Sequence, residues 1–375
     1  MNKTGLVLVA FLLVLFGCKD PYDIPLRPSD QSSLVVDGFL NSGQGSTTIT
    51  LSRVLNIKSP VGFKPEMNAR VFVEGTDNSS YILTERSNGQ YTINQLPLVN
   101  TYQYRLRITT TNGKEYRSDY VTVKKTPVID SISWKKQDEG IRITANAHDQ
   151  TDNTRYYRWE YEETWEIHSF YTAVYKWVSG ITIIRMPSGE STFRCWKDQK
   201  STGILVGSTA QLQSDIVSEG PLIDIPIGSE KIGVRYSILV KQYALTKEAY
   251  QFFQLMKKNT ESLGTIFDAQ PSELSGNMHC LSDSKELVIG FVTASSVEEK
   301  RMFITRSEVG GTFSLGCESI SILNDPDTIK EWIPGRLPYD AEYGTGGNIS
   351  RYLVSDHICV DCKSRGGLLL KPSFW

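Results

Sequence analysis

Residues 155–168, with the sequence RYYRWEYEETWEIH, form the most regularly alternating stretch of the chain. Successive side chains of a β-strand point to opposite faces, so the alternation predicts one long strand with an aromatic face and a charged face. The aromatic face comprises Tyr157, Trp159, Tyr161, Trp165 and Ile167. The charged face comprises Arg158, Glu160, Glu162, Thr164, Glu166 and His168. We expect the aromatic face to cover a core, and residues 170–178 to return as the second strand of a hairpin.

Short segments that are rich in β-branched residues and bounded by turns precede this strand. They lie at residues 33–36, 47–51, 70–73, 80–84, 90–93, 104–109 and 114–123. Asn88-Gly89 and Asn112-Gly113 are typical of tight hairpin turns. Several short strands with almost no helical period predict an immunoglobulin-like β-sandwich over residues 32–126.

Residues 127–375 predict a larger antiparallel β domain with one clear α-helix and a cysteine-containing tail. The helix is expected at 246–262, because Thr246 is a good N-cap and an apolar stripe follows at helical spacing. The fold class is therefore mainly β. Strands of this domain are expected at residues 128–134, 141–145, 203–207, 222–227, 234–243, 287–294 and 301–306.

The composition is that of a globular protein. Of the 375 residues, 39% are hydrophobic and 22% are charged, which argues against a disordered or collagenous chain. The formal net charge of −2 argues against nucleic acid as a partner, because nucleic-acid-binding domains usually carry a basic patch or a clear basic excess.

The start of the chain predicts a secretory signal peptide at residues 1–17. Lys3 precedes an unbroken apolar run at 6–16, which is too short to span a bilayer. Gly17 before Cys18 matches a lipobox, so we expect Cys18 to carry covalent lipid and to begin the mature chain. Two or more acyl chains anchor a protein stably to a membrane. An ordinary signal peptide with a coincidental cysteine is the alternative.

Residues 18–31 are polar and contain several prolines, which predicts an extended tether after the lipidated cysteine. Its charged residues Lys19, Asp20 and Asp23 resemble the export signal of Bacteroidota-type surface lipoproteins. The expected location is the outer membrane, with the protein anchored by lipid and exposed at the cell surface.

Five further cysteines are expected to form disulfides in an oxidising envelope, and they are Cys195, Cys280, Cys317, Cys359 and Cys362. Because five is odd, at most two bridges form and one thiol is left over. His357 with the Cys-x-x-Cys pair, together with His279-Cys280, offers an alternative zinc site. A thioredoxin-like redox role for the Cys-x-x-Cys pair is the weaker alternative.

The charged face of residues 155–168 has a catalytic and a non-catalytic interpretation. Glu160 and Glu162 would lie about 7 Å apart, near the carboxylate spacing of glycosidases. That chemistry needs two carboxylates with separated pKa values in one cleft. The favoured interpretation is a solvated or partner-facing row made of Arg158, Glu160, Glu162, Glu166 and His168.

The sequence contains no motif typical of nucleophilic catalysis or phosphate binding. The sequence has no Gly-x-Ser-x-Gly elbow and no phosphate-binding glycine loop. The acidic loop at 148–153 lacks the spacing of an EF-hand, so a turn is favoured over a calcium site. The 7 Trp and 18 Tyr would favour sugar stacking only where they form an exposed, contiguous patch.

Several motifs together resemble one family. They are Cys18 to Tyr22, Tyr156 to Tyr161, Arg235 to Tyr243, Lys258 to Glu261, Gly276 to Cys280, and the tail from Cys359 through Gly366-Gly367 to Lys371-Pro372. The chain is similar to the Bacteroidota outer-membrane lipoproteins grouped as domain-of-unknown-function family four-two-four-nine. That resemblance implies a β-dominated lipoprotein without assigned chemistry that commonly accompanies a TonB-dependent receptor.

The leading hypothesis is a non-catalytic lid, substrate-capture or assembly subunit of a TonB-dependent receptor or another outer-membrane barrel. No cofactor is expected apart from the lipid on Cys18. The alternatives are a cell-surface hydrolase of glycan or peptide, and a structural or adhesive lipoprotein. A docking subunit predicts a large apolar patch with a polar rim, whereas an enzyme predicts a buried acid pair in a cleft.

Overall fold

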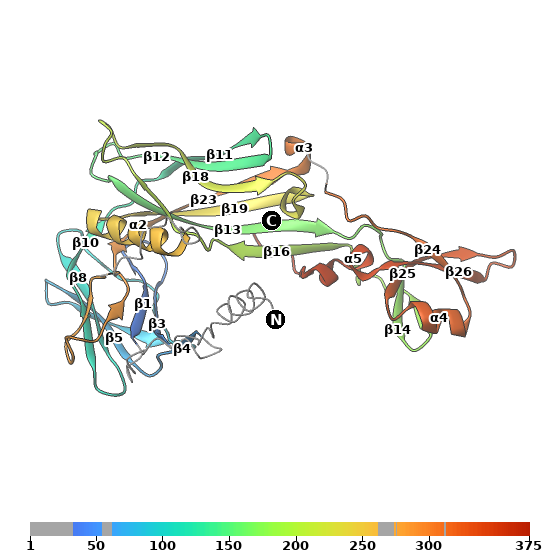
Figure 1. Cartoon of the computed structure of the whole chain (residues 1–375), viewed down its shortest axis with the longest axis horizontal. Coiled ribbons are helices and arrows are strands. Elements are labelled where there is room, and N and C mark those ends of the chain that lie inside the picture. Colours follow the sequence, from blue (N-terminus) through green and yellow to red (C-terminus); the bar gives the residue numbers. More distant parts are fainter. Residues whose placement is uncertain (1–32, 55–61, 262–273, 275, 311–312) are drawn as a thin grey trace, which may run out of the picture.

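The computed structural model describes residues 33–54, 62–261, 274, 276–310 and 313–375 (Figure 1). They form an elongated molecule in which an N-terminal β-sandwich and a lobe from the last part of the chain lie at opposite ends. A second β-sandwich lies between these two parts. The mainly β fold class expected from the sequence is confirmed.

The predicted N-terminal features lie before the first residue that the structure describes. The signal peptide at 1–17, the lipidation site Cys18 and the tether at 18–31 with Lys19, Asp20 and Asp23 lie outside the described residues. In the part of the chain that is described, no helix is long and apolar enough to cross a bilayer.

The first sandwich is built from short strands in which alternate residues point inward. Val71 and Val73 of one strand and Leu106 and Ile108 of its neighbour pack in the core. The N-terminal strands are β1 (Leu34–Gly38), β2 (Leu40–Asn41), β3 (Thr47–Val54), β4 (Phe63–Pro65), β5 (Arg70–Gly75), β6 (Ser80–Glu85), β7 (Gln90–Ile93), β8 (Gln103–Thr109), β9 (Glu115–Ser118) and β10 (Val121–Lys124).

Three later strands complete this sandwich, which corrects the assignment of all residues after 126 to the second domain. They are β20 (Met278–Cys280), which pairs with β9, β21 (Val288–Ile289), which pairs with β1, and β22 (Ala294–Ser295), which pairs with β2 and β10. The side chain of Glu286, only 2% exposed, holds this segment by ion pairs with Arg53 and Lys114. Such long-range pairing has no local sequence signal.

The second sandwich encloses the aromatic face of the alternating strand between two sheets. One sheet has the order β11 (Ile129–Gln137), β12 (Gly140–His148) and β18 (Ile216–Pro226). The other has the order β16 (Arg194–Lys200), β13 (Tyr156–His168), β19 (Arg235–Ala244) and β23 (Val297–Thr305), and β17 (Leu205–Ser208) pairs with β13. Tyr157, Trp159, Trp165 and Ile167 lie in the shared core, as the alternation predicted.

The predicted hairpin between residues 155–168 and 170–178 is wrong. Strand β13 pairs with β16, β17 and β19, whereas β14 (Tyr175–Ser179) forms its own hairpin with β15 (Thr182–Arg185). Gly180, at φ +55°, lies in the short turn between β14 and β15. Alternation reveals the two faces of a strand but not which strand it pairs with. Here β14 pairs with β15, the strand that follows it directly in sequence.

Among the helices of the described residues, the one that the sequence predicted is the longest and the others are short. Helix α2 (Lys247–Glu261) buries Ala249, Phe252 and Phe253. Thr246 caps it by accepting the Ala249 N–H at 3.2 Å, as its N-cap position predicts. Two short helices of the second sandwich are η1 (Glu230–Ile232) and α3 (Arg306–Val309).

The lobe combines the β14–β15 hairpin with the last part of the chain. Its sheet has the order β24 (Ile320–Leu323), β26 (Ile349–Asp356) and β25 (Arg336–Tyr343), and α4 (Pro326–Trp332) covers it. Tyr175 of the hairpin packs in one core with Ile322, Ile329 and Val354. The short helices α5 (His357–Val360) and η2 (Cys362–Arg365) connect the lobe to the second sandwich.

Candidate functional site

The charged row of β13, defined as Arg158, Glu160, Glu162, Glu166 and His168, lies on the outer face of the second sandwich. Each carboxylate of the row has partners from the same sheet. Glu160 accepts hydrogen bonds from Arg158 and from the Tyr243 hydroxyl, the latter at 2.8 Å. Glu162 pairs with Lys241 Nζ at 2.9 Å. The row is therefore largely neutralised by its own sheet.

The far end of the row is covered by the chain itself. Glu166 binds His168 at 2.7 Å and Arg194 at 2.9 Å, and it accepts a hydrogen bond from the Trp375 indole at 3.1 Å. Phe374 packs under Arg301, whose guanidinium carbon lies 3.5 Å from the ring centroid. Glu166, predicted to face a partner, is instead buried, because sequence alternation gives no sign of the covering tail.

The electrostatics of the row do not fit a glycosidase. Partial burial alone would raise the pKa of Glu162, but the hydrogen bond and charge of Lys241 outweigh it and hold the pKa below its usual range. A general acid for glycoside hydrolysis needs a raised pKa. A second carboxylate, Glu299, lies 3.7 Å from the same Lys241 ammonium that pairs with Glu162 at 2.9 Å, so the two acids share one cation on the face of the sheet.

The acidic loop at 148–153 forms a turn. The carboxylate of Asp149 accepts hydrogen bonds from the backbone N–H groups of Thr151 and Thr154, both at 2.9 Å. Burial raises the pKa of Asp149, but these bonds outweigh it and lower the pKa to about 2. Among the described residues, no group of three or more His, Cys, Asp or Glu side chains is arranged to hold a metal ion.

The cysteines form two disulfides, Cys195–Cys362 and Cys317–Cys359, and Cys280 remains a free, buried thiol. Two bridges with one thiol left over is the pattern expected from an odd number. The two members of the Cys-x-x-Cys pair enter different bridges. This arrangement fits neither a zinc knuckle nor a redox-active dithiol.

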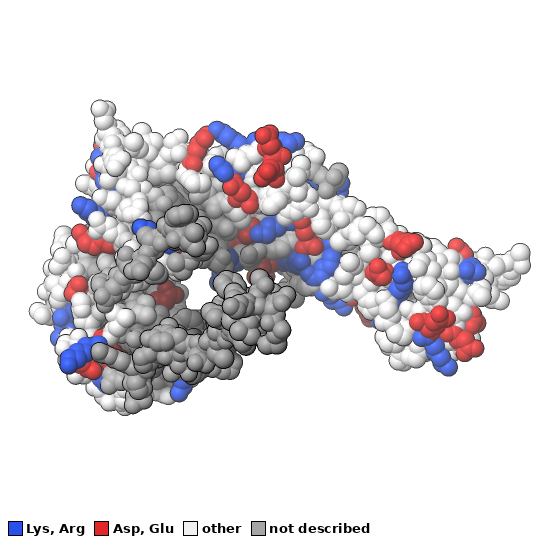
Figure 2. All heavy atoms as spheres, in the orientation of Figure 1, with Lys and Arg blue, Asp and Glu red and all other residues white. Residues whose placement is uncertain are grey.

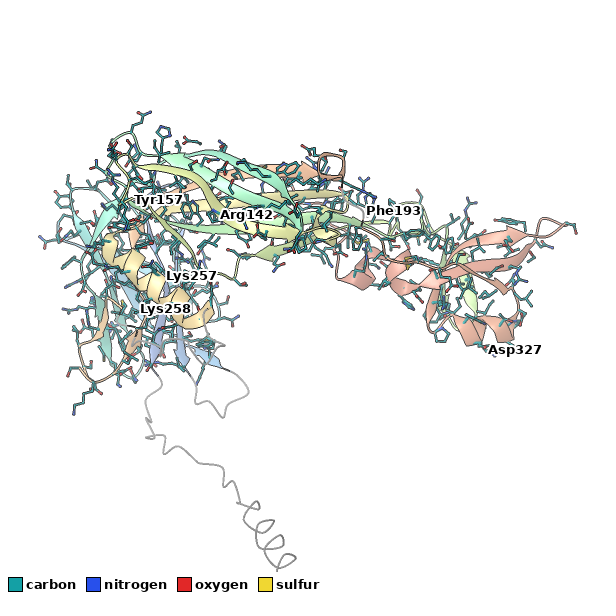
Figure 3. The ribbon with its side chains drawn as sticks, turned by 45° about the horizontal axis from the view of Figure 1, so that its top comes forward. Arg142, Tyr157, Phe193, Lys257, Lys258 and Asp327 are labelled. Atoms are coloured by element: carbon teal, nitrogen blue, oxygen red, sulfur yellow. A yellow bond between two sulfur atoms is a disulfide. The ribbon has the colours of Figure 1, made fainter. Side chains whose placement is uncertain are left out.

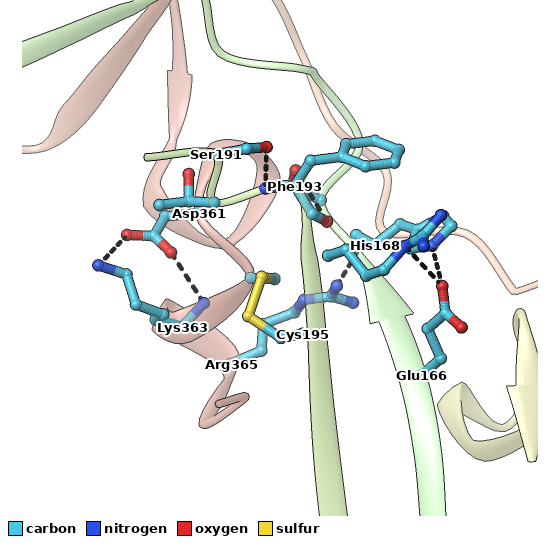
Figure 4. The surroundings of a disulfide bond; sticks show 12 residues. Glu166, His168, Ser191, Phe193, Cys195, Asp361, Lys363 and Arg365 are labelled. Atoms are coloured by element: carbon cyan, nitrogen blue, oxygen red, sulfur yellow. Dashed lines mark hydrogen bonds and ion pairs between the residues drawn. A yellow bond between two sulfur atoms is a disulfide. The ribbon is translucent and has the colours of Figure 1, made fainter. Parts of the chain in front are cut away.

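Both disulfides lie where the lobe meets the second sandwich. Figure 4 shows Cys195 of β16 joined to the segment that carries Asp361, Lys363 and Arg365. Arg365 donates to the backbone carbonyl of His168 and pairs with Glu230 at 3.1 Å. Backbone hydrogen bonds of 2.8 Å join Trp196 of β16 and Leu368 in both directions. The junction is thus cross-linked covalently and by hydrogen bonds.

The lobe exposes apolar side chains on its hairpin. Trp177, Val178, Ile181 and Ile184 are each 39–50% exposed, although they lie on or beside paired strands. Further exposed apolar residues of this part of the chain are Leu323, Tyr343, Ile358, Leu368, Leu369 and Leu370. In the register of the hairpin Trp177 pairs with Ile183 and Ile184 pairs with Lys176, so exposed apolar side chains lie on both of its faces. Exposed apolar surface of this kind can serve as an interaction surface.

A groove of about 430 Å³ opens beside this hairpin, and we call it the lobe groove. Its apolar lining includes Trp177, Met186, Leu337 and Leu369. Four charged residues also line the groove, and they form two ion pairs, Lys176 with Glu190 and Asp361 with Lys363. An apolar groove with a few polar groups is suited to receiving apolar side chains of a partner.

On the visible described surface, acidic and basic side chains are interspersed without a large single-sign patch (Figure 2).

Comparison with known proteins identifies the family. The family model described as "Domain of unknown function (DUF4249)" matches residues 19–301. The chain belongs to this family. No curated protein gives a match to the DUF4249 chain. The match ends at residue 301, before the last strands of the lobe begin.

Solved structures are similar to the chain only at low sequence identity and low TM-score. The DUF4249 chain is similar at 8% identity to the chicken interferon gamma receptor alpha chain, with a TM-score of 0.15, covering 56% of this chain and 87% of that chain. It is similar at 11% identity to a candidate carbohydrate-binding protein from Bacteroides uniformis ATCC 8492, also with a TM-score of 0.15, covering 58% and 91%.

Sequence reasoning missed one buried ionic group of the DUF4249 chain. Glu163 lies on the aromatic face of β13 and is only 1% exposed. Its carboxylate accepts a hydrogen bond from Tyr236 at 2.8 Å and pairs with Lys231 at 2.7 Å. The signal was present, because a carboxylate at an inward position of an aromatic strand requires a buried partner.

Proposed function

We propose that this chain is a non-catalytic docking subunit whose lobe binds a partner protein. The observation that carries the proposal is the exposed apolar hairpin of Trp177, Val178, Ile181 and Ile184 beside the lobe groove. The two disulfides at the base of the lobe support it as well. A rigid apolar surface loses little conformational entropy when it binds, which favours affinity.

The partner that we propose is an outer-membrane barrel of the TonB-dependent receptor class. The motivation is the lipobox at Cys18, the charged residues that follow it and the family resemblance. In this proposal, lipid on Cys18 holds the protein at the membrane and the lobe contacts the parts of the barrel outside the bilayer. The neutralised charged row of β13 supports a docking role over hydrolysis.

The first experiment purifies the full-length lipoprotein from its own outer membrane in mild detergent and identifies stoichiometric partners by mass spectrometry. The same preparation tests whether the Cys18 peptide carries the mass of acyl chains. We expect a TonB-dependent barrel to copurify. A lipoprotein that is recovered without any barrel would overturn the proposal and leave the adhesive or hydrolytic alternatives.

A pair of variants then locates the contact. Trp177→Ser combined with Ile184→Ser removes apolar surface from the hairpin and is expected to abolish copurification. Ile82→Ser, at a 58% exposed position of β6 in the first sandwich, is the matched control and is expected to retain the barrel. Equal recovery of the barrel by both proteins would contradict docking through the lobe.

A further inference from the structure

A second cavity, separate from the lobe, lies between the first turns of α2 and the loop that follows β17. Its volume is about 510 Å³. It is lined by Tyr156, Gln211, Lys247, Tyr250, Gln251 and Gln254, together with smaller residues of the loop. Helix α2 lies against the second sandwich and carries Lys257 and Lys258 further along its length (Figure 3). This α2 groove has no part in the docking role proposed above.

The helical residues of the groove share one face. Lys247, Tyr250, Gln251 and Gln254 follow the spacing of i, i+3, i+4 and i+7, which places side chains in a row on an α-helix. The apolar residues Ala249, Phe252 and Phe253 hold the other face against the protein. The sequence thus turns a row of polar and aromatic side chains outward at a fixed position.

The opposite wall of the groove is also held in place. In the loop after β17, the Thr209 N–H donates to the Arg155 carbonyl at 3.0 Å, and the Leu212 N–H donates to the Thr209 carbonyl at 2.8 Å. Buried Asp215 accepts hydrogen bonds from the Thr209 hydroxyl and from Tyr157, the latter at 2.7 Å. The groove is therefore preformed, as ligand sites usually are.

The lining has the chemistry that recognises a polyhydroxylated ring. Tyr156 and Tyr250 are half-buried with ring centroids 5.1 Å apart, and both pack against the apolar cluster under α2, so only the remaining part of each ring faces the groove. The exposed Gln211, Gln251 and Gln254 carry amide donors and acceptors, and hydroxyl groups need both; Gln254 already donates one hydrogen bond to the Tyr250 hydroxyl at 3.3 Å, which leaves its other donor and its acceptor. Aromatic rings with a polar end suit a surface that is apolar on one side and hydroxylated on the other.

The charge of the lining further restricts the class of ligand that the groove can bind. Among the described residues that line the groove, Lys247 is the one charged side chain, and none is a carboxylate. A site with this lining has no acid or base for glycoside hydrolysis. It also lacks the cluster of cations that would select a strongly anionic ligand.

A neighbouring cavity extends the available surface. It has a volume of about 520 Å³, shares Ser208 and Leu212 with the α2 groove, and includes Trp159 in its lining. We propose that the α2 groove binds a segment of a neutral oligosaccharide without cleaving it. The ligand class is set by the tyrosine pair and the three glutamines, and the shared lining lets a chain of several sugar units continue past one cavity.

The test is affinity electrophoresis of the folded mature protein in gels that contain amylopectin, xyloglucan, galactomannan, dextran or polygalacturonate. We expect at least one neutral polysaccharide to retard the protein. Tyr250→Ala is expected to weaken that binding about tenfold, and Gln254→Ala by a few-fold. Tyr102→Ala, which removes a 41% exposed tyrosine from the first sandwich, is the matched control and is expected to bind normally.

Each outcome of the gel experiment either supports the sugar-binding proposal or overturns it. Loss of retardation in Tyr250→Ala with recovery in Tyr250→Phe, which keeps the ring, supports the proposal when Tyr250→Ala retains the circular dichroism spectrum and thermal midpoint of the original protein. Weaker retardation of Gln254→Ala, at an exposed position, supports it independently of packing. Retardation by no neutral polysaccharide, or by polygalacturonate alone, would overturn it. Retardation that neither Tyr250→Ala nor Gln254→Ala changes would place sugar binding elsewhere and would also overturn it. Barrel copurification tests the docking proposal independently.

Discussion

Replacing Lys231 by methionine is expected to destabilise the second sandwich by about 3–5 kcal/mol, the cost of leaving one partner of a buried ion pair without its counter-charge. The Lys231 ammonium lies 2.7 Å from a carboxylate oxygen of Glu163, and Glu163 is only 1% exposed. Methionine preserves most of the apolar stem of the lysine, whose ammonium lies 5.2 Å from the centroid of the Trp165 ring. The loss therefore reports mainly the missing charge.

Further variants divide this cost among the partners. Tyr236→Phe removes the 2.8 Å hydrogen bond to Glu163 and is expected to cost about 1.5–3 kcal/mol, the usual value for a bond to a charged group. The triple change Glu163→Leu, Lys231→Met and Tyr236→Phe removes every polar member together. It is expected to lie within about 1 kcal/mol of the original protein, because apolar replacement of a buried pair is often neutral.

Urea unfolding followed by tryptophan fluorescence and circular dichroism measures these free energies. Lys200→Met is the control, because Lys200 is 80% exposed and lies 3.9 Å from Glu162, so its loss is expected to change stability by less than about 0.5 kcal/mol. A cost under about 1 kcal/mol for Lys231→Met would refute the reasoning. So would a triple variant that is less stable than Lys231→Met.

Three other predictions concern the junction, the acidic turn and the lobe. Replacing Cys195 and Cys362 by serine removes a cross-link between residues 167 apart, for which the chain-entropy model gives about 5 kcal/mol; we expect a lower thermal midpoint and faster proteolysis at the base of the lobe. Because the pKa of Asp149 is lowered to about 2, its stabilising contribution is complete above the unfolded pKa and is lost as the pH falls through about 2. Asp149→Asn should therefore flatten the dependence of the urea midpoint on pH between about 4 and 2, and an unchanged profile would contradict this. Trp177→Ser should lower the free energy of unfolding by only about 1–3 kcal/mol while weakening partner binding, since the side chain is 39% exposed and its indole donates to the Gly180 carbonyl at 3.0 Å; a loss above about 4 kcal/mol would mean that it belongs to the lobe core.

The sequence predicted the local features of this protein better than its long-range ones. The alternation of 155–168 placed Tyr157 and Trp159 in a core, and the Thr246 cap marked the start of α2 within one residue. Both are set by neighbours along the chain. The return of residues 278–295 to the first sandwich and the burial of Glu166 under Trp375 depend on residues far away in sequence, so no periodic pattern encodes them.

The lobe and the α2 groove were missed for a related reason. An exposed residue such as Trp177 has the same sequence signature as a core residue, because a two-stranded hairpin alternates whether or not one face is covered. The glutamines of α2 resemble an ordinary solvated helix face until the loop after β17 is placed opposite them. Recognition of either surface requires the tertiary arrangement.

The arrangement of the three parts restricts how the docking role can operate. Strand β1, which begins at Leu34, belongs to the first sandwich, and the lobe lies at the opposite end of the molecule (Figure 1). In the docking proposal, lipid on Cys18 would attach the chain on the side of the first sandwich, at the opposite end of the described molecule from the apolar hairpin of the lobe. On this proposal we expect the lobe to contact the extramembrane loops of the barrel rather than its lipid-facing wall, so substitutions in those loops, not in the transmembrane strands, are the ones expected to break the complex.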